Sequence, residues 1–123
     1  MSEILFICEH GSAKSIVAAA HFNRLAAEHG LSLRAISRGT DPDSEVHPGA
    51  LAGLNADGLT PPDEPQKLAP ADLTSAKTII SFSQLGIPGE VWTVPAVSEN
   101  YPLARNAIVE RVTRMIQSLK KST

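Results

Sequence analysis

A short apolar segment that leads directly into a turn and a long helical stretch is the feature that most constrains this chain. Residues 3–7 predict a strand, and the apolar side chains at 4–7 follow one another without the alternation of a half-exposed strand. Such a run is typical of a strand that is buried on both faces of a sheet. Residues 12–29 then predict a helix with an apolar stripe, which Gly30 ends. The fold must therefore cover both faces of this first strand.

The rest of the chain continues the alternation of strands and helices. Further strands are predicted at residues 31–37, 78–82 and 91–94, and further helices at 48–58 and from Pro102 onward. The proline-rich residues 60–70 predict a loop, followed by a helical turn at 71–73. This order predicts one α/β domain, residues 1–123, with a parallel sheet and helices on both faces. If the first strand lies between the second and the third, the loop after it occupies the switch point where ligands bind.

Composition narrows the classes of protein to which the chain can belong. A length of 123 residues with 42% apolar residues suits one hydrophobic core, and the net charge of −2 argues against nucleic acid as a partner. Cys8 is the single cysteine, which excludes an internal disulfide and an all-cysteine zinc site and favours a reducing, cytoplasmic location. We expect no signal peptide and no membrane span, because the N-terminus has no basic region and no apolar run approaches about 20 residues.

Cys8 stands where the first strand ends and the turn into the first helix begins. The N–H groups and the dipole of a helix N-terminus stabilise thiolates and attract phosphate-like anions. Gly11 allows a tight turn, residues 12–14 can direct N–H groups inward, Lys14 can add a positive charge and Ser15 can donate a hydrogen bond to the sulfur. The alternative for Cys8 is a small buried hydrophobe, as most lone cysteines are, but its place at a strand end favours an active-site role.

The chain resembles the low-molecular-weight protein tyrosine phosphatases and the related arsenate reductases in four places, in the same order. Residues 4–20 are similar to their phosphate-binding loop, Cys-x5-Arg-Ser, which here is Cys-x5-Lys-Ser. The other places are Ser-Arg-Gly-Thr at 37–40, Val-His-Pro at 46–48 followed by Gly58, and Trp-Thr-Val-Pro at 92–95 before Ile-Val-Glu-Arg-Val at 108–112. The resemblance therefore covers nearly the whole chain.

The resemblance implies a fold, a mechanism and a set of site residues. The fold is phosphotyrosine protein phosphatase I-like, a four-stranded parallel sheet in the order 2-1-3-4. The mechanism uses no metal and no cofactor: the cysteine attacks phosphorus and forms a cysteinyl phosphate, while an arginine and loop amides hold the oxygens. On this chain the implied catalytic residues are Cys8, Lys14 and Ser15, and the implied phosphate-binding residues are Glu9, His10, Gly11, Ser12, Ala13 and Lys14.

The loop itself departs from the family pattern. Lys14 replaces the arginine, and an ammonium group is a point charge where a guanidinium binds two oxygens in a fixed plane. His10 and Gly11 stand where the family has glycine and asparagine. We therefore expect oxyanion binding to survive and the fit to the transition state to suffer.

The proton donor of the family is also missing. Ala96 replaces its acid aspartate and Val97 the proline that follows. General acid catalysis contributes about 10²–10⁴-fold to a reaction rate, so the loss is large. Glu99 and Asp41 are the substitute acids that the sequence suggests.

Three functions follow, which differ in what happens after an oxyanion binds in the Cys8 loop. The first is hydrolysis of phosphomonoesters, on a phosphoprotein or a small aryl phosphate, impaired by the changes at Lys14 and Ala96. The second is a catalytically degenerate module that only binds oxyanions. The third is an arsenate reductase that depends on an external thiol, because Ser81 and Ser83 stand where a second cysteine is expected. No oligomeric state follows from the sequence.

The histidines do not suggest a metal centre. His10 can orient a substrate or face solvent, and both interpretations stay open. His21 and His29 are expected at the surface or in packing contacts of the first helix, and His47 at the start of the helix that begins near Pro48. The four histidines lack the spacing of metal ligands, so no metal is expected.

Arg38 and Tyr101 each have a functional and a structural interpretation. Arg38 follows the second strand and is either a surface charge or a replacement for the missing arginine. Tyr101 is the single tyrosine and is expected beside the substrate mouth. There it can stack on an aromatic substrate or pack at the start of the last helix.

Overall fold

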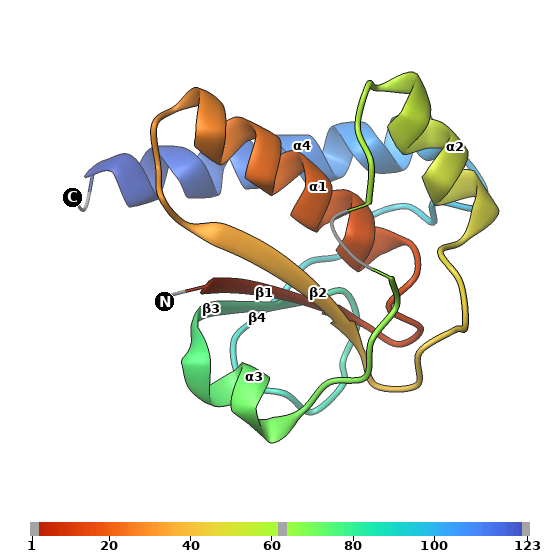
Figure 1. Ribbon diagram of the computed structural model, residues 1–123, viewed down its shortest axis with the longest axis horizontal. Coiled ribbons are helices and arrows are strands. Elements are labelled where there is room, and N and C mark those ends of the chain that lie inside the picture. The colour runs from red at the N-terminus through yellow and green to blue at the C-terminus, as the bar shows by residue number, and fades with distance from the viewer. Residues whose placement is uncertain (1–2, 62–63, 122–123) are drawn as a thin grey trace.

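The chain forms a four-stranded parallel sheet in the order β2-β1-β3-β4, with helices on both of its faces (Figure 1). The computed structural model describes residues 3–61 and 64–121, so residues 62–63 of the predicted 60–70 loop lie outside the description. In chain order the elements are β1 Glu3–Cys8, α1 Lys14–Glu28, β2 Arg34–Gly39, α2 Pro48–Ala56, α3 Pro70–Ser75, β3 Ala76–Ser81, β4 Glu90–Val91 and α4 Tyr101–Lys121. The predicted α/β class and strand order are confirmed.

Helices α1 and α4 lie together on one face of the sheet, and the short helix α3 lies on the other (Figure 1). Between them the apolar residues of the central strand β1 are fully buried, as their unbroken run predicted. Phe6 is the centre of an aromatic cluster, since its ring centroid lies 5.7 Å from that of Trp92 and 6.1 Å from that of Phe82. Burying one such side chain contributes about 1.5–3 kcal/mol, so this cluster fastens residues beyond β3 to the sheet. In the described ranges, no helix is both long and apolar enough to span a membrane.

Two predicted strands have different limits in the structure. β2 begins at Arg34, where its ladder with β1 starts, and the predicted residues 31–33 only connect α1 to the sheet. β4 covers only Glu90–Val91, and the predicted strand residues Trp92 and Val94 are buried against the core beyond the ladder. In both places apolar residues that indicated a strand are in fact packed on the core from a connecting segment.

The carboxyl ends of β1 and β2 bring two glycines into contact. Cys8 and Gly39 form the last pair of the ladder. The loop after Cys8 then passes so close to β2 that a Cβ on Gly11 would lie 2.9 Å from the Gly39 nitrogen. Gly11 also has a φ of +61°, which only glycine adopts without strain. This crossing places the Cys8 loop against the segment that follows β2.

Candidate oxyanion site in the Cys8 loop

The Cys8 thiol lies at the carboxyl end of β1, directly before α1. Its Sγ lies 3.0 Å from Oγ of Ser15, a fully buried side chain in the first turn of the helix. The Ser15 hydroxyl can donate a hydrogen bond to sulfur at this distance, which is the contact that the sequence predicted. Cys8 is half-buried, so its sulfur is held in place and still reachable from solvent.

The carbonyl groups of the Cys8 loop are directed at residues 40–47, the segment that follows β2. Three backbone N–H groups of the segment donate to three loop carbonyls. The pairs are Asp41 to Glu9 at 2.8 Å, Asp43 to His10 at 2.9 Å and His47 to Ser12 at 2.9 Å. Since the C=O and N–H of one peptide unit point in opposite directions, the loop N–H groups are turned away from this segment.

These N–H groups are free to receive an anion. Within the part of the chain that the structure describes, the N–H groups of residues 10–13 have no hydrogen-bond partner. Backbone N–H groups without a partner are rare in folded proteins, and a row of them beside a helix N-terminus forms an anion-binding concavity. Lys14 is half-buried beside the loop and has no ion-pair partner in the described ranges. Together with the Cys8 sulfur, these groups form a cup that suits a tetrahedral oxyanion.

A cavity of about 240 Å³ lies over this cup. Every predicted site residue except Gly11 and Ser15 lines it; Gly11 lies in the glycine crossing and Ser15 contacts the sulfur. The residues that line the cavity are Cys8, Glu9, His10, Ser12, Ala13, Lys14, Asp43, His47, Ala96, Val97 and Ser98. The structure therefore brings the Cys8 loop together with two segments far away in the sequence.

The wall of the cavity holds a carboxylate that the sequence reasoning missed. Ala96, which stands where the family has its acid aspartate, lines the wall, but neither of the suggested substitute acids, Glu99 and Asp41, does so. Asp43 lines it instead, and its Oδ2 accepts a hydrogen bond of 2.6 Å from Ser12 Oγ. No pattern in the sequence singled it out, because hydrogen bonds to His10 and Ser12, more than 30 residues away, place Asp43 in the wall.

Two histidines take different positions around the cavity. His10 is 54% exposed at the rim, with Nδ1 3.2 Å from the Asp41 carbonyl oxygen and 3.6 Å from Asp43 Oδ1. His47 precedes α2, and its Nδ1 accepts a hydrogen bond of 3.0 Å from the Gly49 N–H. His47 thus has the role at the start of the helix that the sequence predicted, and it also forms part of the cavity wall.

Arg38 and Tyr101 do not reach the cavity. Arg38 Nε donates a 3.2 Å hydrogen bond to Asp72 Oδ2 in α3, so it is an ion-paired side chain and no replacement for the missing arginine. Tyr101 donates a 2.7 Å hydrogen bond from its hydroxyl to Asp57 Oδ2 at the end of α2. Its structural interpretation, packing at the start of α4, is therefore the one that the structure supports.

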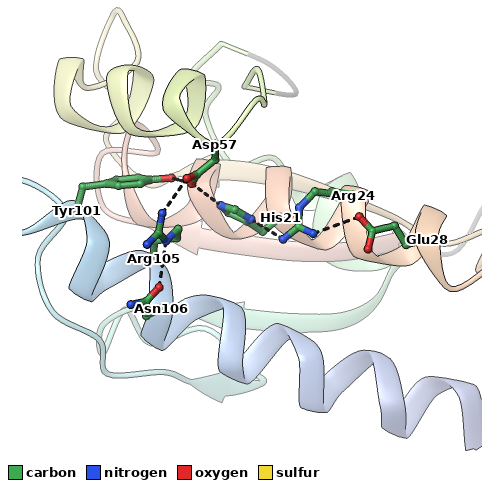
Figure 2. Close-up of polar contacts among 7 residues, drawn as sticks. All are labelled: His21, Arg24, Glu28, Asp57, Tyr101, Arg105 and Asn106. Atoms are coloured by element: carbon green, nitrogen blue, oxygen red, sulfur yellow. Dashed lines mark hydrogen bonds and ion pairs between the residues drawn. The ribbon is translucent and has the colours of Figure 1, made fainter.

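A second polar cluster, away from the Cys8 loop, joins three helices (Figure 2). His21 of α1 has a 3% exposed side chain, and its Nε2 lies 3.3 Å from Asp57 Oδ2. Arg24 Nη2 lies 3.1 Å from His21 Nδ1 and donates to it, so the proton of the neutral ring is on Nε2. Arg105 of α4 donates a 2.8 Å hydrogen bond to Asp57 Oδ1, and Tyr101 donates to Oδ2. His21 is thus a packing residue, one of the two roles expected for it.

The cluster shifts the pKa values of its members. Burial, supported by the charge of Arg24, lowers the pKa of His21 below 6.5 despite the opposing effect of Asp57. Burial acts to raise the pKa of Asp57, but hydrogen bonds from Tyr101 and Arg105 outweigh it and hold that pKa below 3.8. Burial and the bond to Asp57 raise the pKa of Tyr101 well above 10.0. At neutral pH these shifts favour a neutral His21 beside an ionised Asp57.

The parallel sheet and the amide-lined cysteine loop at its carboxyl edge place the chain among the α/β proteins with a site at a switch point. The sequence profile of the low molecular weight phosphotyrosine protein phosphatase family matches residues 3–87, and the chain belongs to this family. The resemblance predicted from the sequence is thereby confirmed. The match includes the Cys8 loop and ends before Ala96. No curated protein sequence matches the chain.

Solved structures of phosphatases and reductases share the fold. YfkJ from Bacillus subtilis has a TM-score of 0.86 at 20% identity, with 100% of this chain and 97% of that one covered. The YwlE arginine phosphatase from Geobacillus stearothermophilus has a TM-score of 0.79 at 17% identity, covering 99% and 95%. The arsenate reductase from Archaeoglobus fulgidus has a TM-score of 0.75 at 22% identity, covering 93% and 98%. At these identities the similarity establishes the fold alone.

Proposed function

We propose that this protein binds phosphate or a similar oxyanion in the loop from Cys8 to Ser15 and hydrolyses phosphomonoesters, tyrosine phosphate among them. The observation that carries the proposal is the row of N–H groups at residues 10–13 without partners, next to the half-buried Cys8 sulfur. Phosphoryl transfer needs a positioned nucleophile and donors for three equatorial oxygens, which this loop supplies. Membership of a phosphatase family supports the same chemistry.

In the proposed reaction the Cys8 thiolate attacks phosphorus, the S–P bond forms and the bond to the leaving oxygen breaks. Loop N–H groups and the Lys14 ammonium hold the oxygens that carry the charge. Water then attacks the cysteinyl phosphate, the S–P bond breaks, and its electron pair returns to sulfur while phosphate leaves. No metal or cofactor takes part. The nucleophile must stay reduced, so we place the protein in the cytoplasm, acting on a phosphoprotein or a small aryl phosphate.

Two other functions use the same cup. Ala96 in the cavity wall favours an oxyanion-binding module without turnover, because it removes the family's proton donor. An arsenate reductase is among the structures that share the fold. Since Cys8 is the single cysteine, reduction of arsenate would need an external thiol to resolve the sulfur–arsenic adduct.

The decisive experiment is rapid acid quenching of the protein during reaction with 4-nitrophenyl phosphate, followed by mass spectrometry of the peptide that contains Cys8. We expect a phosphate adduct on Cys8 and a burst of 4-nitrophenol, both absent in Cys8→Ala. Lys14→Ala should weaken phosphate binding about 10–100-fold in calorimetry, because it removes a charge-assisted hydrogen bond of about 1.5–3 kcal/mol.

Matched variants and probes separate the alternatives. Lys121→Ala, at the exposed end of α4, should leave phosphate affinity unchanged. Phosphate binding without an adduct would indicate the module. Arsenite formed from arsenate only with added glutathione or thioredoxin would indicate the reductase. Neither an adduct nor a calorimetric signal for phosphate, sulfate or arsenate would contradict the proposal.

A further inference from the structure

The cavity offers a proton donor in a different place from the family's. Ala96 cannot supply a proton, and in the described ranges Glu9 and Asp43 are the carboxylic acids that line the cavity. We infer that Asp43 is the general acid and base of the reaction, taking over the role of the aspartate that Ala96 replaces. This inference rests on the proposed phosphatase function and assigns its missing step.

Asp43 is held in place at both its backbone and its side chain. Its N–H donates to the His10 carbonyl at 2.9 Å, and the flanking bonds from Asp41 and His47 fasten the same segment to the Cys8 loop. The carboxylate is oriented by the buried Ser12, whose Oγ donates to Oδ2 at 2.6 Å. A catalytic acid needs this kind of fixed geometry, because proton transfer occurs only within hydrogen-bond reach.

Glu9 lacks this support. Its side chain is 63% exposed, and the ion pair that the structure gives it is a distant one, 4.0 Å from Oε1 to His10 Nε2. Holding such a long side chain in one rotamer costs entropy that an exposed contact of this length does not offset. Asp43 is therefore the better positioned of the two carboxyl groups.

The surroundings of Asp43 also suit repeated proton transfer. His10 Nδ1 lies 3.6 Å from Oδ1, so a polar ring nitrogen at the rim stands close to the carboxyl group that gives up and takes back the proton. The side chain of Asp43 is 48% exposed, which leaves it in contact with water. The family's donor position comes after the fourth strand, whereas Asp43 comes from the segment between β2 and α2.

Over one turnover, Asp43 gives up one proton and takes one back. As the S–P bond forms and the P–O bond breaks, the Asp43 carboxylic acid gives its proton to the leaving oxygen, and the alcohol or phenol departs. The Asp43 carboxylate next takes a proton from the water that attacks the cysteinyl phosphate. The S–P bond breaks, the electron pair returns to Cys8, and phosphate leaves with Asp43 protonated again.

The test is the leaving-group dependence of kcat/KM, which reports on phosphorylation of Cys8, in the wild type and in Asp43→Asn. Poor leaving groups need a proton in the transition state and good ones do not. We therefore expect Asp43→Asn to lose about 10²–10⁴-fold with phenyl phosphate and less than about 10-fold with 2,4-dinitrophenyl phosphate. The cysteinyl phosphate formed from 2,4-dinitrophenyl phosphate should accumulate in the variant, because its hydrolysis loses the base.

The matched control is Asp41→Asn, the same change two residues away in a side chain outside the cavity, which should follow the wild type for both esters. Calorimetry with phosphate checks that the Asp43→Asn loop is intact. An equal loss for both esters, or no loss for either, would overturn the role of Asp43 while leaving the phosphatase proposal in place. Failure of the wild type to form cysteinyl phosphate would overturn both.

Discussion

Gly11 is the residue whose replacement should damage the site most cleanly. A side chain at this position would lower the free energy of unfolding for two reasons. The φ of +61° strains any residue with a Cβ, and the added Cβ would lie only 2.9 Å from the Gly39 nitrogen. Alanine at a left-handed position costs about 1–2 kcal/mol, before any clash is counted. The clash falls on backbone atoms of β2, so it cannot be relieved by a side-chain rotation.

Gly58 provides the control that separates the backbone strain from the steric clash. Its φ is +78°, but an added Cβ would meet nothing within 4 Å. We expect Gly58→Ala to lower the free energy of unfolding by about 1–2 kcal/mol. Gly11→Ala should lose clearly more in the same urea titration and should also lose phosphate binding. An equal decrease in the free energy of unfolding for the two variants would show that the Cys8 loop moves to avoid the clash with β2.

The contact between the buried His21 of α1 and Asp57 at the end of α2, to which Arg105 and Tyr101 of α4 also donate, makes the packing of these three helices depend on pH. Because the folded pKa of His21 lies below 6.5, the unfolded chain takes up a proton that folded His21 resists as the pH falls through 6.5. Stability from this residue is present above 6.5 and is lost on acidification toward the folded pKa. The lowered pKa of Asp57 makes the stability depend on pH only below pH 3.8. The raised pKa of Tyr101 makes it depend on pH only above pH 10.0.

We therefore expect the free energy of unfolding of the wild type to fall between pH 7 and pH 5, measured by urea titration at each pH. His21→Gln should reduce this dependence, because it removes the titrating ring. His29→Gln, which changes an exposed histidine, should retain the wild-type dependence. A His21→Gln protein with the wild-type pH dependence would assign the effect to other groups.

At the scale of the whole molecule, we expect a bound oxyanion to change the Cys8 cup and to leave the His21 cluster as it is. Phosphate in the cup would give the N–H groups of residues 10–13 the acceptors that they lack. We expect saturating phosphate to slow amide hydrogen exchange there and in the attached residues 41–47. Exchange around His21 and at the C-terminal half of α4 should stay the same. Unchanged exchange at residues 10–13 with phosphate bound would contradict the cup geometry.

Local pattern was sufficient to predict most of this fold and the centre of the site. The apolar run of β1, the turn after it and the helix that follows identify Cys8 and the loop to Ser15 without knowledge of any distant contact. Asp43 could not be predicted, because its position depends on hydrogen bonds to His10 and Ser12, each 31 residues or more away from it. The Tyr101–Asp57 bond, across 44 residues, is hidden in the same way. The prediction was wrong at Trp92. Its apolar side chain indicated a strand, but the residue lies beyond β4 and only packs on the core.

The three backbone bonds from residues 41–47 to the Cys8 loop also have a consequence during synthesis. The loop and its thiol emerge from the ribosome first, but the partners that shape them follow more than 30 residues later. Before residue 39 has emerged, the end of β1 lacks its ladder partner Gly39, and before residue 47 has emerged, the loop lacks the last of its three backbone bonds. We therefore expect the loop around Cys8 to take its folded shape only after β2 and residues 41–47 are made, and an N-terminal fragment ending before residue 39 would carry the thiol without the contacts that shape this loop.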